Sequence, residues 1–159
     1  MGTTHLIILG DREPLAWVLE SQRMAFPAGR GSGLPEKGDE ILLYTTRGCF
    51  RNPGRDRGRI MGLATVTSEV AALPDPVSFG GRDFTSGCTL QVHGLAPRHE
   101  GVILADLVPQ LQVFPDPKTW SVRMRRASLK LPEPDADLLR RELQPILRTR
   151  TAVLGQYAL

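Results

Sequence analysis

Cysteine and histidine are scarce in this sequence, and their scarcity argues against two kinds of site. The 159-residue chain has two cysteines, Cys49 and Cys88, which are too few for a disulfide framework or for a zinc site built from four cysteines. Both are expected to be free thiols. The three histidines are scattered along the chain, so we expect no metal site.

The recurring motifs of nucleotide-dependent and hydrolytic enzymes are also missing. The chain contains no GxxxxGK[ST] phosphate loop, no GxGxxG after a strand, and no HExxH, GxSxG or CxxC motif. Its candidate acids, such as Asp83, Glu100 and Asp106, have no spacing that would pair them. We therefore expect no cofactor, and a catalytic site would have to use residues that spacing does not reveal.

Long hydrophobic runs are absent as well. The N-terminal sequence MGTTHLIILGDREP has no basic segment and only a short apolar run. No stretch elsewhere approaches the roughly 18 apolar residues of a membrane span. The sequence therefore predicts neither a signal peptide nor a span, and we expect a cytoplasmic protein that does not bind membranes.

Charge is only mildly unbalanced, but arginine is abundant. The net charge of +3 and the pI of 9.2 would not by themselves indicate a nucleic-acid partner. Of the 20 basic residues only Lys37, Lys118 and Lys130 are lysines, so 17 are arginines. Arginine suits bidentate contacts to phosphate and stacking on bases, although GC-rich codons would enrich it too.

The patterning along the chain predicts one α+β domain, residues 1–159. Strand patterns cover residues 4–9, 40–46, 59–67, 84–95, 120–126 and 127–131, and helical patterns cover residues 12–23, 101–108 and the stretch from Asp135 onward. Pro145 should kink or split the last helix. Residues 24–36 are predicted as a loop, and Pro74 and Pro76 should end the third strand. This order favours a small open β-barrel of five or six strands with peripheral helices.

The most informative stretch is an arginine-rich loop, residues 47–58, between two predicted strands. Its glycines and a proline rule out regular structure. It carries four arginines against one acid, Asp56, and one aromatic ring, Phe50, and it follows Tyr44 closely. Guanidinium groups beside flat rings suit an anionic partner with planar bases. The alternative is a solvated basic hairpin.

This stretch also resembles a known family. A Gly-Asp turn, a strand ending in tyrosine, a loop and a strand reading I-x-G-x-A-x-V are similar to the EVE branch of the PUA-like superfamily, with ASCH domains as the alternative branch; the residues are Gly38, Asp39, Tyr44, Ile60, Gly62, Ala64 and Val66. The resemblance implies a PUA-like α+β barrel. It also implies a ligand pocket that the loop of residues 24–36 closes, so Phe26 could line that pocket or dock on the core.

The leading hypothesis is a nucleic-acid-binding module that accepts a single base in an aromatic-sided pocket. The partner would be DNA or RNA, and the resemblance suggests that the base is a modified one. Tyr44 would be the pocket wall and Phe26 a second plate, with Phe50 nearby. Thr45 and Thr46 would offer hydroxyl groups to base edges. The phosphates would be held by Arg47, Arg51, Arg55 and Arg57. Alternatively, Tyr44 fills the core and its hydroxyl finds a backbone partner.

Two other classes of function stay open. Some ASCH proteins are small amidohydrolases or nucleases, and the residues that could serve such chemistry here are Lys37, Thr45, Thr46 and Glu69. The third class is a protein-binding or small-ligand-binding module that uses Phe26, Phe50 and Phe79 as apolar contacts. The oligomeric state stays open.

Overall fold

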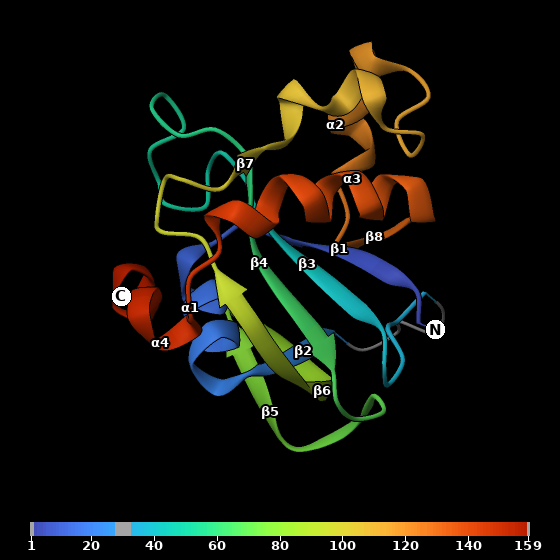
Figure 1. The fold of residues 1–159 in the computed structure, drawn as a ribbon. Helices are drawn as coiled ribbons and strands as arrows, with labels where there is room; N and C mark the ends of the chain where they lie inside the picture. The colour runs from blue at the N-terminus through green and yellow to red at the C-terminus, as the bar shows by residue number, and fades with distance from the viewer. Residues whose placement is uncertain (1, 28–32, 159) are drawn as a thin grey trace.

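The computed structural model describes residues 2–27 and 33–158 and has the predicted α+β architecture (Figure 1). One sheet contains eight strands in this part of the chain: β1 (Thr4–Leu9), β2 (Arg23–Pro27), β3 (Glu40–Thr45), β4 (Arg59–Val66), β5 (Ala71–Phe79), β6 (Arg82–Leu95), β7 (Val102–Ile103) and β8 (Ser128–Leu131). The described α-helices are α1 (Arg12–Ser21), α2 (Trp120–Arg123), α3 (Glu133–Leu143) and α4 (Arg150–Val153). None of the helices within these residues is long and apolar enough to cross a membrane.

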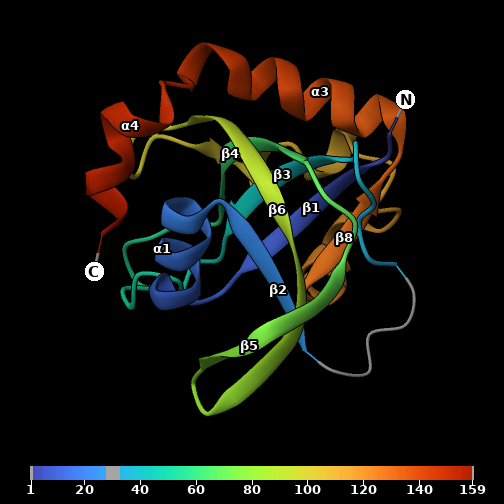
Figure 2. The ribbon, with the colours of Figure 1, turned by 90° about the horizontal axis from the view of Figure 1, so that it is seen from below.

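The sheet has the order β2-β6-β4-β3-β1-β8, with β5 paired to β6 and β7 paired to β4. Strands β1 and β3 are parallel, and the other pairs are antiparallel. Figure 2 shows the sheet curled into an open half-barrel, with α1 on one side and α3 along the other. The predicted open barrel with peripheral helices is therefore confirmed, with eight strands where five or six were expected.

Strand β3 shows how the sheet separates two cores. Its side chains alternate between the faces, so Ile41 and Leu43 join the cluster around α1, whereas Leu42 and Tyr44 join the cluster beneath α3. All four are buried. A strand covered on both faces has a continuous apolar sequence rather than an alternating one, which is why residues 41–44 are ILLY.

Helix α1 begins at the predicted Arg12 and ends two residues before the predicted residue 23, and α3 begins two residues before the predicted Asp135. In α1, the Asp11 side chain accepts a hydrogen bond from the Glu13 amide at 3.2 Å, and Gln22 ends the helix in the left-handed region. In α3, Asp135 is buried and its carboxylate accepts hydrogen bonds from the backbone amides of Gln112 and Val113, which lie between β7 and α2 in the chain. Pro145 lies in a 3₁₀ turn that follows α3, as the predicted split requires.

The prediction of a strand over residues 120–126 is wrong. The first four residues of this segment form the single turn of α2, and Trp120 packs edge-on against Phe114 with ring centroids 5.8 Å apart. Trp120 and Met124 both pack on the cluster beneath α3. Because these two residues are four apart, their spacing fits one helical face as well as one strand face. A seven-residue alternation therefore did not decide between the two structures.

Three further predictions need correction, each for a tertiary reason. Residues 101–108 begin as strand β7 rather than as a helix, because Gly101 lets the backbone approach Ile60 on β4 closely. The first part of the predicted loop 24–36 is strand β2, which pairs with β6; residues 28–32 of that loop lie outside the described residues. Pro74 and Pro76 lie inside β5, at a register irregularity of an edge strand, where prolines are tolerated.

Candidate functional site

An aromatic pocket of about 200 Å³ opens between α1, the end of β1, β2 and the β5–β6 hairpin. Figure 2 shows how the ribbons of these elements are arranged. Four aromatic residues from these elements line it: Trp17, Phe26, Phe79 and Phe84. Aliphatic side chains of β1, α1 and β2 complete the walls, and Arg82 lies at the hairpin turn. The pocket is thus largely apolar, with a guanidinium group among its lining residues.

Three of the four rings, those of Trp17, Phe79 and Phe84, pack edge to face. The Trp17 and Phe79 centroids are 5.7 Å apart, and the Phe79 and Phe84 centroids are 5.5 Å apart. Arginines lie over two of the rings: the Arg23 guanidinium is 5.3 Å from the Trp17 centroid, and the Arg82 guanidinium is 5.9 Å from that of Phe84. These contacts fix the rings and bring positive charge to the pocket.

Phe26 combines both roles considered for it. It is 3 % exposed and belongs to the core around α1, and its ring also lines the aromatic pocket. Strand β2 fixes it there by pairing Phe26 with Ser86 of β6. Trp17 of α1 is half-buried, packs against the same core and lines the pocket.

Tyr44 lies on the opposite face of the sheet from Phe26. Its side chain is in the core beneath α3, and burial raises its pKa to about 12. A side chain at Gly58 would collide with the Tyr44 hydroxyl, so the tyrosine supports the end of the arginine-rich loop from below. The structure therefore does not bring Tyr44 and Phe26 into one pocket.

The two threonines after Tyr44 join the loop to the barrel. Thr45 is buried, and its hydroxyl donates a hydrogen bond to the Arg59 carbonyl at 3.4 Å. The Thr46 amide donates to the Leu9 carbonyl at the end of β1, and the Thr46 side chain is only partly buried. Thr46 and the segment after Leu9 thus bring the start of the loop to the end of the aromatic pocket at Gly10.

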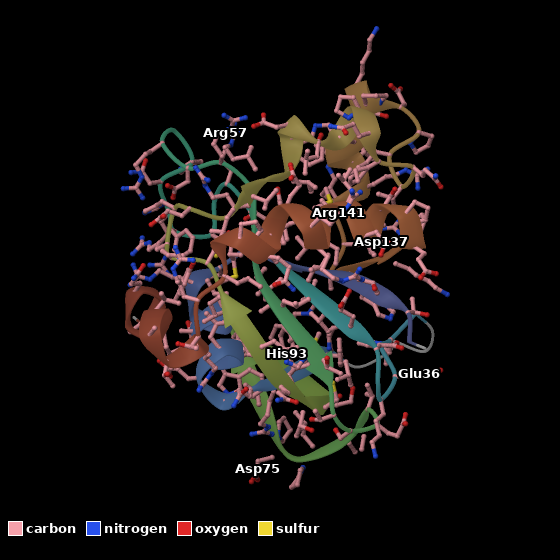
Figure 3. The ribbon with its side chains drawn as sticks, viewed as in Figure 1. Glu36, Arg57, Asp75, His93, Asp137 and Arg141 are labelled. Atoms are coloured by element: carbon pink, nitrogen blue, oxygen red, sulfur yellow. The ribbon has the colours of Figure 1, made fainter. Side chains whose placement is uncertain are left out.

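The four loop arginines are exposed but point to different neighbours. Arg51 lies 3.7 Å from Asp11, at the start of α1 and beside the aromatic pocket. Arg55 and Arg57 lie on the other side of the loop, where they contact Asp56 and Asp106 at 2.8 and 3.6 Å. Figure 3 shows Arg57 on this side of the loop. Arg47 is exposed at the loop's start.

A second, charged cleft of about 150 Å³ lies on that far side of the loop and contains a histidine that sequence reasoning missed. It is lined by Arg55, Asp56, Arg57, Arg59 and His99. Phe50 adjoins it rather than the aromatic pocket, with its ring 6.1 Å from that of His99. No spacing in the sequence links position 99 to the arginine-rich loop, because the pairing of β7 with β4 brings them together.

The residues proposed for amidohydrolase chemistry are not brought together. Lys37 precedes β3 and is exposed, whereas Thr45 ends the same strand and Thr46 follows it. Glu69 is exposed between β4 and β5, at the Lys37 end of the barrel. Among residues 2–27 and 33–158, no group of three or more histidine, cysteine or acidic side chains is arranged to hold a metal ion.

Neither a protein-family model nor a curated protein sequence matches this chain. Several solved structures are similar. The crystal structure of the DUF55 domain of human thymocyte nuclear protein 1 is 16 % identical, with a TM-score of 0.53, and the match covers 88 % of this chain and 98 % of that one. An ASCH protein from Zymomonas mobilis is 13 % identical, with a TM-score of 0.54 and coverages of 92 % and 97 %. A protein from Rhodopseudomonas palustris, solved by NMR, is 17 % identical, with a TM-score of 0.53 and coverages of 91 % and 94 %.

DUF55 domains, also called EVE domains, and ASCH domains are both PUA-like. This chain therefore has the PUA-like fold that its Gly-Asp turn and I-x-G-x-A-x-V strand suggested.

Proposed function

We propose that this protein is a nucleic-acid-binding module that accepts one unpaired base in the aromatic pocket. The observation that carries the proposal is the pocket itself, which combines four aromatic residues with arginines over two of the rings. Stacking of a base on such a ring contributes roughly 1–3 kcal/mol and tolerates every base. At about 200 Å³ the pocket is smaller than the sites of drug-sized ligands, and it suits one planar heterocycle.

The lining of the pocket favours a base that carries an apolar modification. Ile7, Leu9, Val18 and Met24 give its floor an aliphatic character. A base whose polar edge enters such a floor without hydrogen-bond partners loses free energy. A methyl or similar group directed at the floor would instead bury apolar surface. The fold's resemblance to EVE domains agrees with a modified base.

Positive charge on both sides of the pocket suits the phosphates that flank the bound base. Arg47 and Arg51 belong to the loop that meets the pocket at Gly10. On the other side, the segment that precedes Ala127, a residue of the pocket lining, has three exposed arginines: Arg123, Arg125 and Arg126. A single strand, or a base flipped from a duplex, could therefore cross the pocket mouth between these two basic segments.

Fluorescence of Trp17 tests this proposal directly. The chain has two tryptophans, so a Trp120→Phe variant reports on Trp17 alone. We expect oligonucleotides with one central methylated base to quench this fluorescence, with a midpoint that matches binding measured by anisotropy. An oligonucleotide with an abasic position at the same place should bind more weakly and quench little.

A matched pair of substitutions then separates the pocket from the basic surface. Phe84→Leu removes a ring that packs on Phe79 but keeps an apolar side chain, so we expect weaker binding and loss of the preference for the modified base. The control is Val122→Ala, at an exposed apolar position of α2. Equal binding of abasic and base-containing strands would contradict the proposal.

A further inference from the structure

The charged cleft beside the arginine-rich loop is built around a buried carboxylate. The Asp56 side chain is only 4 % exposed, and its carboxylate accepts a hydrogen bond from Arg55 Nε at 2.8 Å. That hydrogen bond, with burial acting against it, holds the pKa of Asp56 below its usual range. The site therefore keeps a fixed negative charge at its base near neutral pH.

This carboxylate positions His99. The Nδ1 atom of His99 lies 3.5 Å from Asp56 Oδ1, so the Nδ1 side of the ring faces the carboxylate and Nε2 lies on the other side. A carboxylate on one ring nitrogen determines which nitrogen remains for a ligand. The His99 backbone has φ of 70°, a conformation that costs free energy for a residue other than glycine. The His99 side chain is 44 % exposed, so a ring held in this orientation can present Nε2 to the cleft.

Three arginines surround this histidine with donors. Arg59 uses one guanidinium nitrogen to donate to the Gly101 carbonyl at 2.8 Å, and a guanidinium has five N–H donors in all. The Arg57 guanidinium approaches Asp106 no closer than 3.6 Å, and both side chains are more than half exposed. Arg55 is bound to Asp56. Donors of this kind suit the oxygens of a phosphoryl group.

The charges that face His99 come from three segments. The loop contributes Arg55, Arg57 and Asp56, β4 contributes Arg59, and the turn before β7 contributes Arg98. Glu100 follows His99 in the chain. Arg98 is held over the Phe50 ring at 4.5 Å. Together with Asp106, which contacts Arg57, these groups have four positive and three negative charges. A neutral His99 leaves the cleft with one excess positive charge, and a protonated His99 leaves it with two.

We propose that this cleft binds a phosphoryl group, with His99 Nε2 as a proton-dependent donor beside Arg57 and Arg59. The bound oxygen would accept a hydrogen bond from imidazolium, while Asp56 holds the opposite edge of the ring. Binding would thus take up a proton at His99. The same chemistry fits a phosphate of a nucleic-acid strand, a terminal phosphate or the free anion.

The pH dependence follows from the direction of the His99 titration. In the free protein, burial lowers the pKa of His99, and nearby arginines act in the same direction, against Asp56. The neutral form of His99 therefore predominates at pH 7 without ligand, and a bound anion would raise its pKa. Affinity should consequently rise as pH falls through the interval between the free and bound pKa, by up to about tenfold per pH unit when one proton is taken up.

NMR of the histidine rings tests the site without any assumption about the aromatic pocket. We expect excess inorganic phosphate to raise the titration midpoint of His99 and to leave that of His93, which is exposed on β6 (Figure 3), unchanged. Sulfate, which does not change its charge near neutral pH, should have the same effect. An unchanged His99 midpoint in excess phosphate and excess sulfate would overturn the proposal.

Substitutions test the role of His99, and a pair of oligonucleotides identifies the source of the phosphoryl group. His99→Asn keeps a residue that tolerates the left-handed backbone and should abolish the pH dependence of binding, while His93→Asn should preserve it. Oligonucleotides with and without a 5′-phosphate distinguish a terminal phosphate from a backbone phosphate. Suppose that Trp17 fluorescence reports normal base binding, but the binding of phosphate and of oligonucleotides changes with pH in the same way in the wild type and in His99→Asn. This inference then fails while the proposed function stands.

Discussion

Asp39→Asn should destabilise the protein strongly, because one carboxylate joins three segments of the chain. Asp39 Oδ2 accepts hydrogen bonds from the Glu36 amide and from His5 Nε2, each at 2.9 Å, and Oδ1 accepts one from the Thr3 amide at 3.0 Å. Both Asp39 and His5 are buried. The aspartate of the Gly-Asp turn thus connects β1, the approach to β3 and the preceding loop.

The magnitude follows from those three contacts. A hydrogen bond to a charged group contributes about 1.5–3 kcal/mol, but an amide at position 39 keeps some of the contacts through its single oxygen. We therefore expect Asp39→Asn to cost about 2–4 kcal/mol of unfolding free energy. For a chain of this size each 1 kcal/mol lowers Tm by about 2–4 °C, so Tm should fall by roughly 10 °C. Urea unfolding followed by circular dichroism measures the free energy, and thermal unfolding followed in the same way measures Tm.

The same carboxylate makes a signed prediction for acid. Burial acts to raise the pKa of Asp39, but the hydrogen bonds from Glu36, His5 and Thr3 lower it below the ordinary value of 3.8. A folded pKa below the unfolded one stabilises the protein above the unfolded pKa, and this contribution disappears as pH falls through the folded pKa. The wild type should lose this stability below about pH 4, and Asp39→Asn should lack that part of the acid dependence. Equal stability of the two proteins at pH 7 would refute this account of the turn.

Three further predictions concern the proposed site and its alternatives. Replacing Arg51 and Arg55 with alanine should reduce the slope of log Kd against log salt by about 0.7–0.9 for each phosphate that the variant no longer neutralises. Arg141→Ala on α3 is the control and should leave the slope unchanged. A double variant that keeps the full slope would show that the loop is not part of the interface. Tyr44→Ala should cost roughly 3–5 kcal/mol of unfolding free energy, as other large aromatic truncations in cores do. The folded fraction of this variant should bind nucleic acid as the wild type does. Weaker binding without loss of stability would indicate instead that Tyr44 is a pocket residue. Incubation with N-acylated cytidine nucleosides or single-stranded RNA should give no turnover by chromatography, and product that disappears in Lys37→Ala would favour the amidohydrolase alternative.

The sequence predicted the elements whose hydrophobic pattern is decided locally. Strands β1, β3, β4 and β6 and helix α1 were found within a few residues, because each has an apolar run or period bounded by turn residues. The missed strands depend on their partners instead. Strand β2 is a five-residue segment that ends in Pro27, and β5 contains two prolines, so neither would form without β6 between them.

The same reasoning explains why the aromatic pocket was only partly predicted. The sequence indicated Phe26 as a pocket residue and Phe79 as an apolar contact, but it placed Trp17 only within a predicted helix and Phe84 only within a predicted strand. These four rings come from α1, β2, β5 and β6, and no pattern within any one of those elements indicates that they meet. Their meeting depends on the pairing of β2 and β5 with opposite edges of β6, which is a long-range property of the sheet.

The position of Tyr44 at the end of β3 explains why the sequence suggested it as the pocket wall, although its side chain lies in the core beneath α3. A tyrosine that ends a strand beside an arginine-rich loop is adjacent to that loop in the chain, but its ring follows the alternation of the strand. Leu43 and Tyr44 therefore face opposite cores, and only the Leu43 face belongs to the cluster that contains Phe26. The arginine-rich loop reaches both places: Arg51 lies next to α1, and Arg55 lies next to His99 at the charged cleft. One arginine-rich sequence thus contributes charge to two separate sites, so substitutions at Arg51 and Arg57 should affect base-dependent binding and pH-dependent phosphate binding separately.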